Sequence, residues 1–387
     1  MNSTVPPYSL VVNPFLVAAT SSVDGIVDDI GRLVRIESPS RDVERVAASA
    51  AAVADLIATL TGLRAELVAS PVGPHVVVRA TGRARVMLLG HHDTVHRAGT
   101  IDERPFSTSD GVLRGPGVFD MKAGIVQALH AVRILRESGS DVSGVSMLFT
   151  ADEEIGSKTS RAMIEEMATG VEAVLVLEPS ADGGALKTAR KGTGTFEVMI
   201  EGRASHAGLE PEKGINALVE LAHQVQLING FGRPELGTTV TPTVATAGTT
   251  DNTVPDRAVI LVDARVVVPE EKARVESLMQ SLTPVVAGAR ISVSGGLDRP
   301  PLHESMSAEL FDLARDVARE IDGRSLDGVA VGGGSDGNFT AAIGVKTLDG
   351  LGAVGGGAHG VDEHVIVDSI PFRTALLAGI ASRLLAR

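Results

Sequence analysis

Apolar residues recur every three or four positions in several stretches early in the chain, which predicts amphipathic helices. Two of these stretches, 23–36 and 43–60, flank a polar turn, and a third runs from about 122 until Gly139 ends it. Shorter apolar runs bounded by glycine or proline predict strands at 67–68, 75–80, 86–89, 145–149 and 173–177. Strands that alternate with helices in this way indicate an α/β domain.

The pattern changes after residue 190. A strand, a helix, two strands, a helix and a strand are predicted in that order, at 195–201, 214–228, 239–247, 257–268, 270–282 and 289–294. This β-α-β-β-α-β order predicts a ferredoxin-like α+β unit. Helices at 307–321 and 369–385 and a strand at 345–348 then return to the α/β style. We therefore predict one α/β domain formed by 1–190 and 302–387, interrupted by an inserted domain at 191–301.

Composition and charge narrow the possible classes of protein. The chain has 387 residues and no cysteine, so it can bury a large core, and metal ligands must come from His, Asp and Glu. Its net charge of -13 argues against partners such as nucleic acid or an anionic membrane. The first basic residue is Arg32, so the apolar patch at 15–19 lacks the positive region of a secretory signal. We expect 1–20 to be a loose N-terminal arm and the protein to be cytoplasmic.

Three of the predicted strands end in residues that can bind metal. The strands at 86–89, 145–149 and 173–177 are followed by His91 and Asp93, by Glu153 and Glu154, and by Glu178. Because ligands bind outside the carboxyl ends of parallel strands, we expect these side chains to share one polar site. Carboxylate and imidazole groups together suit a divalent metal ion.

Each candidate also has a simpler interpretation. His91 and Asp93 would share a face at a strand end, where Asp93 could orient the imidazole, but they could also form an ordinary polar loop. Asp120 lies in a glycine-flanked turn before a helix, where it could bridge two cations or cap the helix. Glu153 and Glu154 could both face one cavity or simply be solvated.

Five segments resemble the co-catalytic dinuclear zinc peptidases. This family includes glutamate carboxypeptidase of the carboxypeptidase G type, acetylornithine deacetylase, succinyl-diaminopimelate desuccinylase and the aminoacylases. The segments are 90–95, 117–122, 152–156, 177–179 and 358–363. The resemblance implies a zinc-peptidase-like catalytic domain that binds two zinc ions per subunit, for which cobalt or manganese could substitute.

The resemblance also implies roles for single residues. His91, Asp120 and Glu178 would hold one zinc ion, and Asp120, Glu154 and His359 would hold the other. Glu153 would be the general base, Asp93 would orient a metal ligand from behind, and a cis peptide bond would follow Asp120.

The predicted insert carries three segments, 203–208, 251–255 and 263–265, that look like the lid and dimerisation domain of the same family. The resemblance implies a homodimer in which His206 and Asn252 reach the active site of the partner subunit, where His206 stabilises the oxyanion. Arg265 would bind the free carboxylate of the substrate. Without the resemblance, His206 is a turn histidine and Arg265 a charged strand residue. The glycine run that ends at Gly334 resembles a loop that offers backbone amides to the substrate.

These observations lead us to expect zinc-dependent hydrolysis of the amide bond of an N-acyl amino acid or small peptide with a free C-terminal carboxylate, most similar to the glutamate carboxypeptidase branch. One alternative is an N-acyl-amino-acid deacylase or dipeptidase without glutamate preference. Another is a metal-binding interaction protein that keeps the fold but not the chemistry. The cations Lys187, Arg190, Lys191 and Arg299 would either meet a second substrate carboxylate or be solvated hinge charges.

Overall fold

The computed structural model describes residues 13–387 and divides into two compact units. The first unit combines Met1–Thr188 with Glu304–Val329 and Ile343–Arg387, and the second combines Ala189–His303 with Ala330–Ala342. The chain therefore passes between the units at 188/189, 303/304, 329/330 and 342/343. The sequence division placed 330–342 in the α/β domain, whereas in the structure these residues belong to the second unit, because arginine side chains of that unit bind their carbonyl groups.

A six-stranded sheet forms the centre of the first unit, in the order β1-β2-β6-β3-β7-β16. Its strands are β1 (Glu66–Val68), β2 (His75–Val78), β3 (Val86–His91), β6 (Val145–Thr150), β7 (Ala173–Val176) and β16 (Thr347–Leu348). Strands β6, β3, β7 and β16 are parallel, and β2 and β1 pair antiparallel at one side. All residues of β2, β3, β6 and β7 are buried, so both faces of the sheet are covered.

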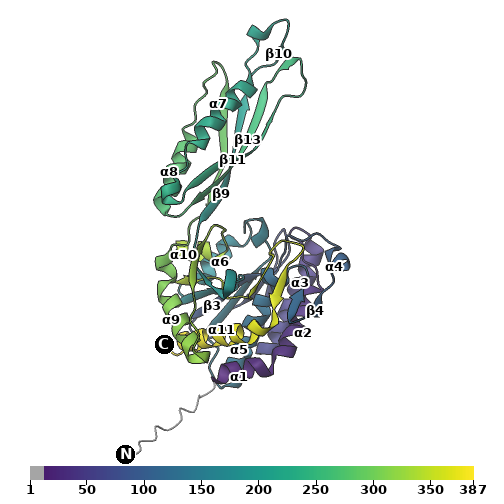
Figure 1. The fold of residues 1–387 in the computed structure, drawn as a ribbon, viewed down its shortest axis with the longest axis vertical. Helices are drawn as coiled ribbons and strands as arrows, with labels where there is room; N and C mark the ends of the chain where they lie inside the picture. Colours follow the sequence, from purple (N-terminus) through teal and green to yellow (C-terminus); the bar gives the residue numbers. More distant parts are fainter. Residues whose placement is uncertain (1–12) are drawn as a thin grey trace, which may run out of the picture. The chain divides into compact units, whose positions relative to one another are not determined.

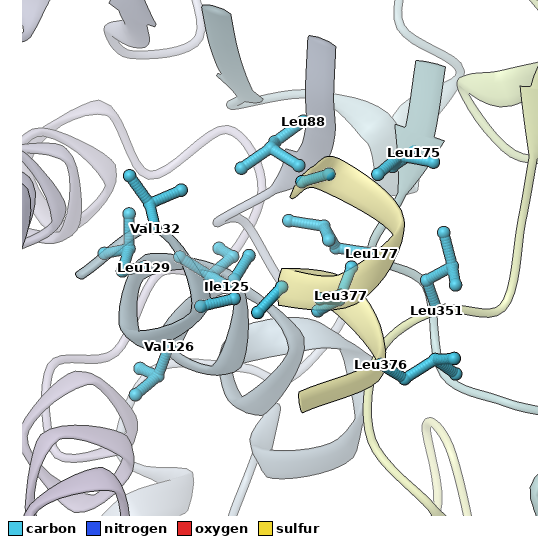
Figure 2. Packing of buried hydrophobic residues seen from close by; sticks show 14 of the residues in the cluster. Leu88, Ile125, Val126, Leu129, Val132, Leu175, Leu177, Leu351, Leu376 and Leu377 are labelled. Atoms are coloured by element: carbon cyan, nitrogen blue, oxygen red, sulfur yellow. The ribbon is translucent and has the colours of Figure 1, made fainter. Parts of the chain in front are cut away.

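Long helices complete the core of this unit. They are α2 (Val23–Val34), α3 (Val43–Thr61), α5 (Ala123–Glu137), α9 (Glu304–Asp322) and α11 (Ile370–Leu385). Figure 2 shows side chains of α5 and α11, among them Leu129 and Leu377, packed near Leu88 of β3. Each fully buried leucine contributes roughly 1.5–3 kcal/mol relative to an exposed one. No helix within residues 13–387 is long and apolar enough to cross a membrane.

The N-terminal arm expected from the sequence contains a helix, α1 (Pro14–Ser21), which packs against α11. The expectation of a loose arm is wrong for these residues. The Asn13 side chain accepts hydrogen bonds from the amides of Phe15 and Leu16 at 2.9 and 3.3 Å, and proline occupies the first helical position. Residues 1–12 of the expected arm lie outside the described part of the chain.

The second unit has the predicted β-α-β-β-α-β order. Its elements are β9 (Gly192–Glu201), α7 (Ala217–Asn229), β11 (Thr239–Ala247), β13 (Arg257–Val266), α8 (Pro269–Gln280) and β14 (Arg290–Arg299). The strands form an antiparallel sheet in the order β11-β13-β9-β14, which is ferredoxin-like. Alternate residues such as Phe196 and Ile260 are buried with residues of α7 and α8, which lie along the sheet (Figure 1).

Shorter elements connect these parts. In the first unit they are α4 (Thr100–Glu103), β4 (Ser107–Ser109), β5 (Val112–Arg114), α6 (Arg161–Ala168), β17 (Gly355–Gly356) and β18 (His364–Ile366). In the second unit they are β10 (Ser205–His206), β12 (Thr253–Val254) and α10 (Gly337–Ala342). Strands β8 (Leu186–Arg190) and β15 (Gly328–Val331) pair with each other where the chain leaves the first unit.

Candidate metal centre

The parallel pairing of β3 with β6 and β7 brings the three strand ends predicted from the sequence to one edge of the sheet. His91 is the last residue of β3, Glu153 begins a single helical turn after β6, and Glu178 lies two residues beyond β7. The order of the strands in the sheet therefore gathers ligands that are 87 positions apart in the sequence, from 91 to 178.

Two glycines position Glu178 by allowing close backbone approach. A Cβ atom on Gly124 of α5, or on Gly352, would lie 2.2 Å from the carbonyl oxygen of Leu177. The amide of Gly352 also donates to the carbonyl oxygen of Glu178 at 2.9 Å. Larger residues at either glycine would push this segment away from the strand ends.

Asp120 lies at the centre of the cluster, between two histidines. Its Oδ1 is 3.2 Å from Nε2 of His91, and its Oδ2 is 3.4 Å from Nε2 of His359. Glu178 Oε1 lies 3.6 Å from the same nitrogen of His91, and Glu154 Oε2 lies 3.2 Å from that of His359. Two groups of possible metal ligands, one around His91 and one around His359, therefore share the Asp120 carboxylate. The peptide bond between Asp120 and Met121 is cis, as the resemblance implies.

The donor set fits divalent metal ions. Ligand atoms of His91, Asp120 and Glu154 lie within 4.8 Å of one another, as do those of His91, Glu153 and Glu178. The Oε1 atom of Glu154 is buried and has no hydrogen-bond partner among residues 13–387. A buried carboxylate oxygen without a partner is costly unless a cation satisfies it. Imidazole nitrogens and carboxylate oxygens at these spacings suit zinc and similar ions.

The carboxylates of the cluster strongly favour protonated histidines. Burial alone would lower the pKa of His91, but the carboxylates of Asp120 and Asp93 outweigh it and raise that pKa well above its usual value. Asp120 and Glu154 raise the pKa of His359 to about 10. Burial raises the pKa of Glu154, while hydrogen bonds from the two histidines overcome burial at Asp120 and hold its pKa well below its usual range. Without metal, protons on the imidazoles therefore offset the negative charge.

Asp93 is fully buried and contacts both the histidine and the glutamate pair. The Nδ1 atom of His91 lies 3.0 Å from the backbone carbonyl oxygen of Asp93 and 3.5 Å from the side-chain Oδ1 of Asp93. The amides of Glu153 and Glu154 approach the two carboxylate oxygens at 3.3 and 3.4 Å, and Ser40 donates to Oδ2 at 2.7 Å. Asp93 thus fixes the direction of Nε2 of His91 and anchors the turn that carries both glutamates. Sequence reasoning missed Ser40, which lies in an unremarkable polar turn.

Four predicted site residues lie in the second unit: His206, Asn252, Arg265 and Gly334. The first two lie close together. His206 on β10 pairs with Thr253 of β12, and the carbonyl oxygen of the adjoining Asn252 accepts the amide of Ala207 at 2.9 Å. The exposed His206 ring accepts the amides of Gly208 and Leu209 at its Nδ1, at 3.1 and 3.2 Å. A neutral imidazole held in this way carries its proton on Nε2 and can donate outward.

Arg265 contacts the glycine loop, residues 332–334, which contains the predicted site residue Gly334. Arg265 Nε and Nη2 donate to the two carboxylate oxygens of Asp263 at 3.0 and 3.2 Å, and Nη1 donates to the carbonyl oxygen of Gly332 at 2.8 Å. Arg190 Nη1 donates to the next two carbonyl oxygens, that of Gly334 at 3.2 Å. Three of the five N–H groups of Arg265 are thereby used, two by Asp263 and one by the loop, and together they fix the guanidinium.

Three of the four cations considered for a second substrate carboxylate contact other residues of the second unit. Arg190 is buried and binds the glycine loop, and Lys191 Nζ donates to the carbonyl oxygen of Gly237 at 2.5 Å. Arg299 is buried over the ring of Phe339, with Nη2 3.6 Å from an oxygen of Asp336. These three cations therefore have partners within the second unit, whereas Lys187 lies in the first unit.

Comparison with known proteins gives a family match. The profile of peptidase family M20/M25/M40 matches residues 87–383. Carboxypeptidase G2 from Pseudomonas sp. (strain RS-16) is 31% identical over 381 residues, which cover 95% of this chain and 91% of that protein. Succinyl-diaminopimelate desuccinylase from Thioalkalivibrio sulfidiphilus is 25% identical over 80% of this chain and 86% of its own length.

Solved structures share the fold. The aminopeptidase PepT from Bacillus cereus has a TM-score of 0.76 at 22% identity, with 94% of this chain and 99% of that chain covered. An M20 family metallo-carboxypeptidase from Sulfolobus solfataricus has a TM-score of 0.73 at 16% identity, with 95% and 99% covered.

Proposed function

This chain belongs to peptidase family M20/M25/M40 and is a metal-dependent hydrolase, and on that premise we propose that it hydrolyses the amide bond of an N-acyl amino acid or small peptide with a free C-terminal carboxylate. The observation that carries the proposal is the Asp120 carboxylate, whose two oxygens face two histidines flanked by glutamates. Such a set could hold two ions on either side of one carboxylate.

Two zinc ions are the proposed cofactor, with cobalt or manganese as possible substitutes. His91, Asp120 and Glu178 would hold one ion, and Asp120, Glu154 and His359 the other. When bound, the metal pair would lower the pKa of the attacking water and polarise the amide carbonyl. The Oε1 atom of Glu154, which has no hydrogen-bond partner within residues 13–387, supports a cation at this place.

Metal binding is expected to release up to about two protons per subunit near pH 7, because His91 and His359 must give up their protons to become ligands. The raised pKa of both imidazoles means that protons compete with metal, so metal affinity should rise with pH up to the His359 pKa of about 10. Calorimetry in buffers of different ionisation enthalpy measures the release. The His359→Ala variant is the control and should release about one proton fewer. Binding without proton release would contradict the assignment.

Glu153 is the proposed general base. Its carboxylate lies among the ligand atoms of His91 and Glu178, and its backbone amide is anchored by Asp93. From this position Glu153 would take a proton from the attacking water and pass it to the leaving amine. His206 would donate its Nε2 proton to the oxyanion, a role that fits a ring whose Nδ1 is occupied by backbone amides.

Arg265 and the glycine loop are the proposed site for the substrate carboxylate, with Asn252 as a further substrate contact near His206. Arg265 keeps two N–H groups beyond those used for Asp263 and Gly332, and no further partner for them appears within residues 13–387. A planar guanidinium fixed in this way can bind a carboxylate with little loss of side-chain entropy.

A homodimer formed through the second unit is also part of the proposal. Strand β11 is an edge of its sheet, and α7 packs beside it. Leu218 and Leu227 of α7 and Val244 of β11 expose 47–50% of their surface. An edge strand bordered by exposed apolar side chains is typical of a surface that pairs with another chain.

The test of the proposed function is a panel of N-acyl amino acids with acidic, basic and neutral leaving residues. The protein should lose all hydrolysis after chelation and recover it with zinc, cobalt or manganese. A preference for glutamate would support a glutamate carboxypeptidase. Similar rates across the panel would support the second candidate, an N-acyl-amino-acid deacylase or dipeptidase, which the protein contacts of Arg190, Lys191 and Arg299 favour. Metal binding without hydrolysis of any substrate would contradict both.

If His206 acts on the active site of the partner subunit, two inactive variants should restore each other. In a mixed dimer of Glu153→Ala and His206→Ala subunits, one site has both residues intact. With random exchange about half the dimers are mixed, so activity should recover to roughly a quarter of wild type per subunit. Tagged subunits would verify exchange. No recovery in proven mixed dimers would mean that His206 serves its own subunit.

A further inference from the structure

Glu363 is a buried carboxylate that lies outside the proposed set of metal ligands and contacts the loop of Asp120. The residue is 2% exposed. The Oε1 atom accepts the amides of Phe119 and Asp120 at 2.9 and 3.0 Å, and Oε2 accepts the amide of Gly117 at 2.9 Å. Glu363 therefore holds the stretch of backbone that leads into Asp120 and presents its carboxylate.

The same carboxylate is linked to the loop of His359. His96 Nε2 lies 2.7 Å from Oε2 of Glu363, and Arg104 Nη2 lies 3.2 Å from Nδ1 of His96. Arg104 Nη1 donates to the carbonyl oxygen of Gly360 at 2.7 Å, next to His359. One chain of hydrogen bonds thus joins the loops that carry Asp120 and His359.

The direction of these hydrogen bonds is fixed. Arginine can only donate, so Nδ1 of His96 accepts from Arg104, and the proton of His96 lies on Nε2 and points at Glu363. Glu363 then accepts four hydrogen bonds and donates none, which fills the four lone-pair sites of a carboxylate.

We propose that Glu363 is a positioning residue that fixes the Asp120 carboxylate and the His359 imidazole relative to each other, so that both can bind one metal ion. The inference rests on the proposed function, since it requires that Asp120 and His359 bind a common ion. Groups that orient ligands from behind typically change metal affinity or activity by 10- to 100-fold when they are lost.

The near-isosteric Glu363→Gln substitution separates this role from simple space filling. In either orientation the amide NH₂ faces two donors, the amides of Phe119 and Asp120 or that of Gly117 together with His96. His96 cannot compensate by moving its proton to Nδ1, because Arg104 already donates there. The substitution keeps the volume and replaces one oxygen that accepts two hydrogen bonds by an NH₂ group that accepts none.

Cobalt(II) titration of the metal-depleted, full-length protein tests the proposal, because cobalt absorption reports the coordination of each ion. In Glu363→Gln, the ion held by Asp120, Glu154 and His359 should bind about 10- to 100-fold more weakly, and the cobalt spectrum should change. Arg104→Met, which keeps Glu363 but cuts the link to Gly360, should also weaken binding, by less than Glu363→Gln does.

Glu220→Gln is the matched control. Glu220 is also a fully buried glutamate that accepts two backbone amides, those of Val285 and Val286, but it lies in the second unit. This variant should lower the melting temperature of the metal-free protein and leave cobalt affinity and spectrum unchanged.

The outcomes are distinguishable. Wild-type affinity and spectrum in Glu363→Gln would overturn the inference, as would an equal loss of affinity in Glu220→Gln. If Glu363→Gln does not fold, Arg104→Met decides, and unchanged binding in that variant would overturn the proposed link. A wild-type protein that binds no metal would instead refute the proposed function.

Discussion

Replacing Glu153 with alanine is expected to lower kcat by roughly 10² to 10⁴-fold, or more, while the metal content stays at the wild-type level. Glu153 lies in the cluster of ligand atoms, but the proposed ligands are complete without it: Asp120 and the two other carboxylates each have a place beside a histidine. Loss of the base removes the proton acceptor for water and the proton donor for the leaving amine, without removing a metal ligand.

Metal content by elemental analysis and kcat under saturating substrate are the two measurements. Glu166→Ala on the exposed face of α6 serves as the control, because it removes a carboxylate of the same kind from the surface of the same unit. Near-normal turnover in Glu153→Ala at full metal content would exclude Glu153 as the base. Loss of one metal ion would reassign it as a ligand.

The second large effect is expected at Arg265. The Arg265→Ala variant should lose roughly 2 to 4 kcal/mol in kcat/KM, about 30- to 700-fold, on substrates with a free carboxylate, because the guanidinium would pair with that group away from bulk water. Substrates in which the carboxylate is replaced by an amide should be nearly unaffected. The comparison of the two substrates therefore separates recognition of the carboxylate from a general structural defect.

Arg257→Ala is a matched control for this experiment. Arg257 is exposed on the same strand, eight residues earlier, so its side chain leaves the same face of the sheet. It should have wild-type kinetics on both substrates. Equal losses on acid and amide in Arg265→Ala would show that Arg265 mainly holds the loop at Gly332, to which it already donates.

Much of the fold follows from local patterns in the sequence. The alternation of inward residues in β13 and the apolar runs of β3, β6 and β7 are signals that a single sequence carries. The gathering of His91, Glu154 and Glu178 could be predicted because parallel strands end at one edge. His359 follows no buried strand, so only the resemblance pointed to it. The roles assigned to these residues remain predictions.

Other features depend on contacts that sequence patterns do not encode. Glu363 lies within the segment 358–363, yet its partners at 117–120 are more than 240 positions away. The assignment of 330–342 to the second unit likewise depends on arginines far earlier in the chain. Helix α1 is different, because Asn13 and Pro14 form a helix start signal that the sequence itself carries.

The four passages of the chain between the units bear on how this protein is made in the cell. Domains generally fold as units during synthesis, N-terminal parts first. The sheet of the second unit is complete once residue 299 has been made, but the carbonyl groups of 332–334 that Arg190 and Arg265 bind are made only later. The core of the first unit is completed later still, because α11, which packs on α5 and α1, ends at Leu385. A ribosome that stops even one helix early would therefore release a chain without a finished catalytic core.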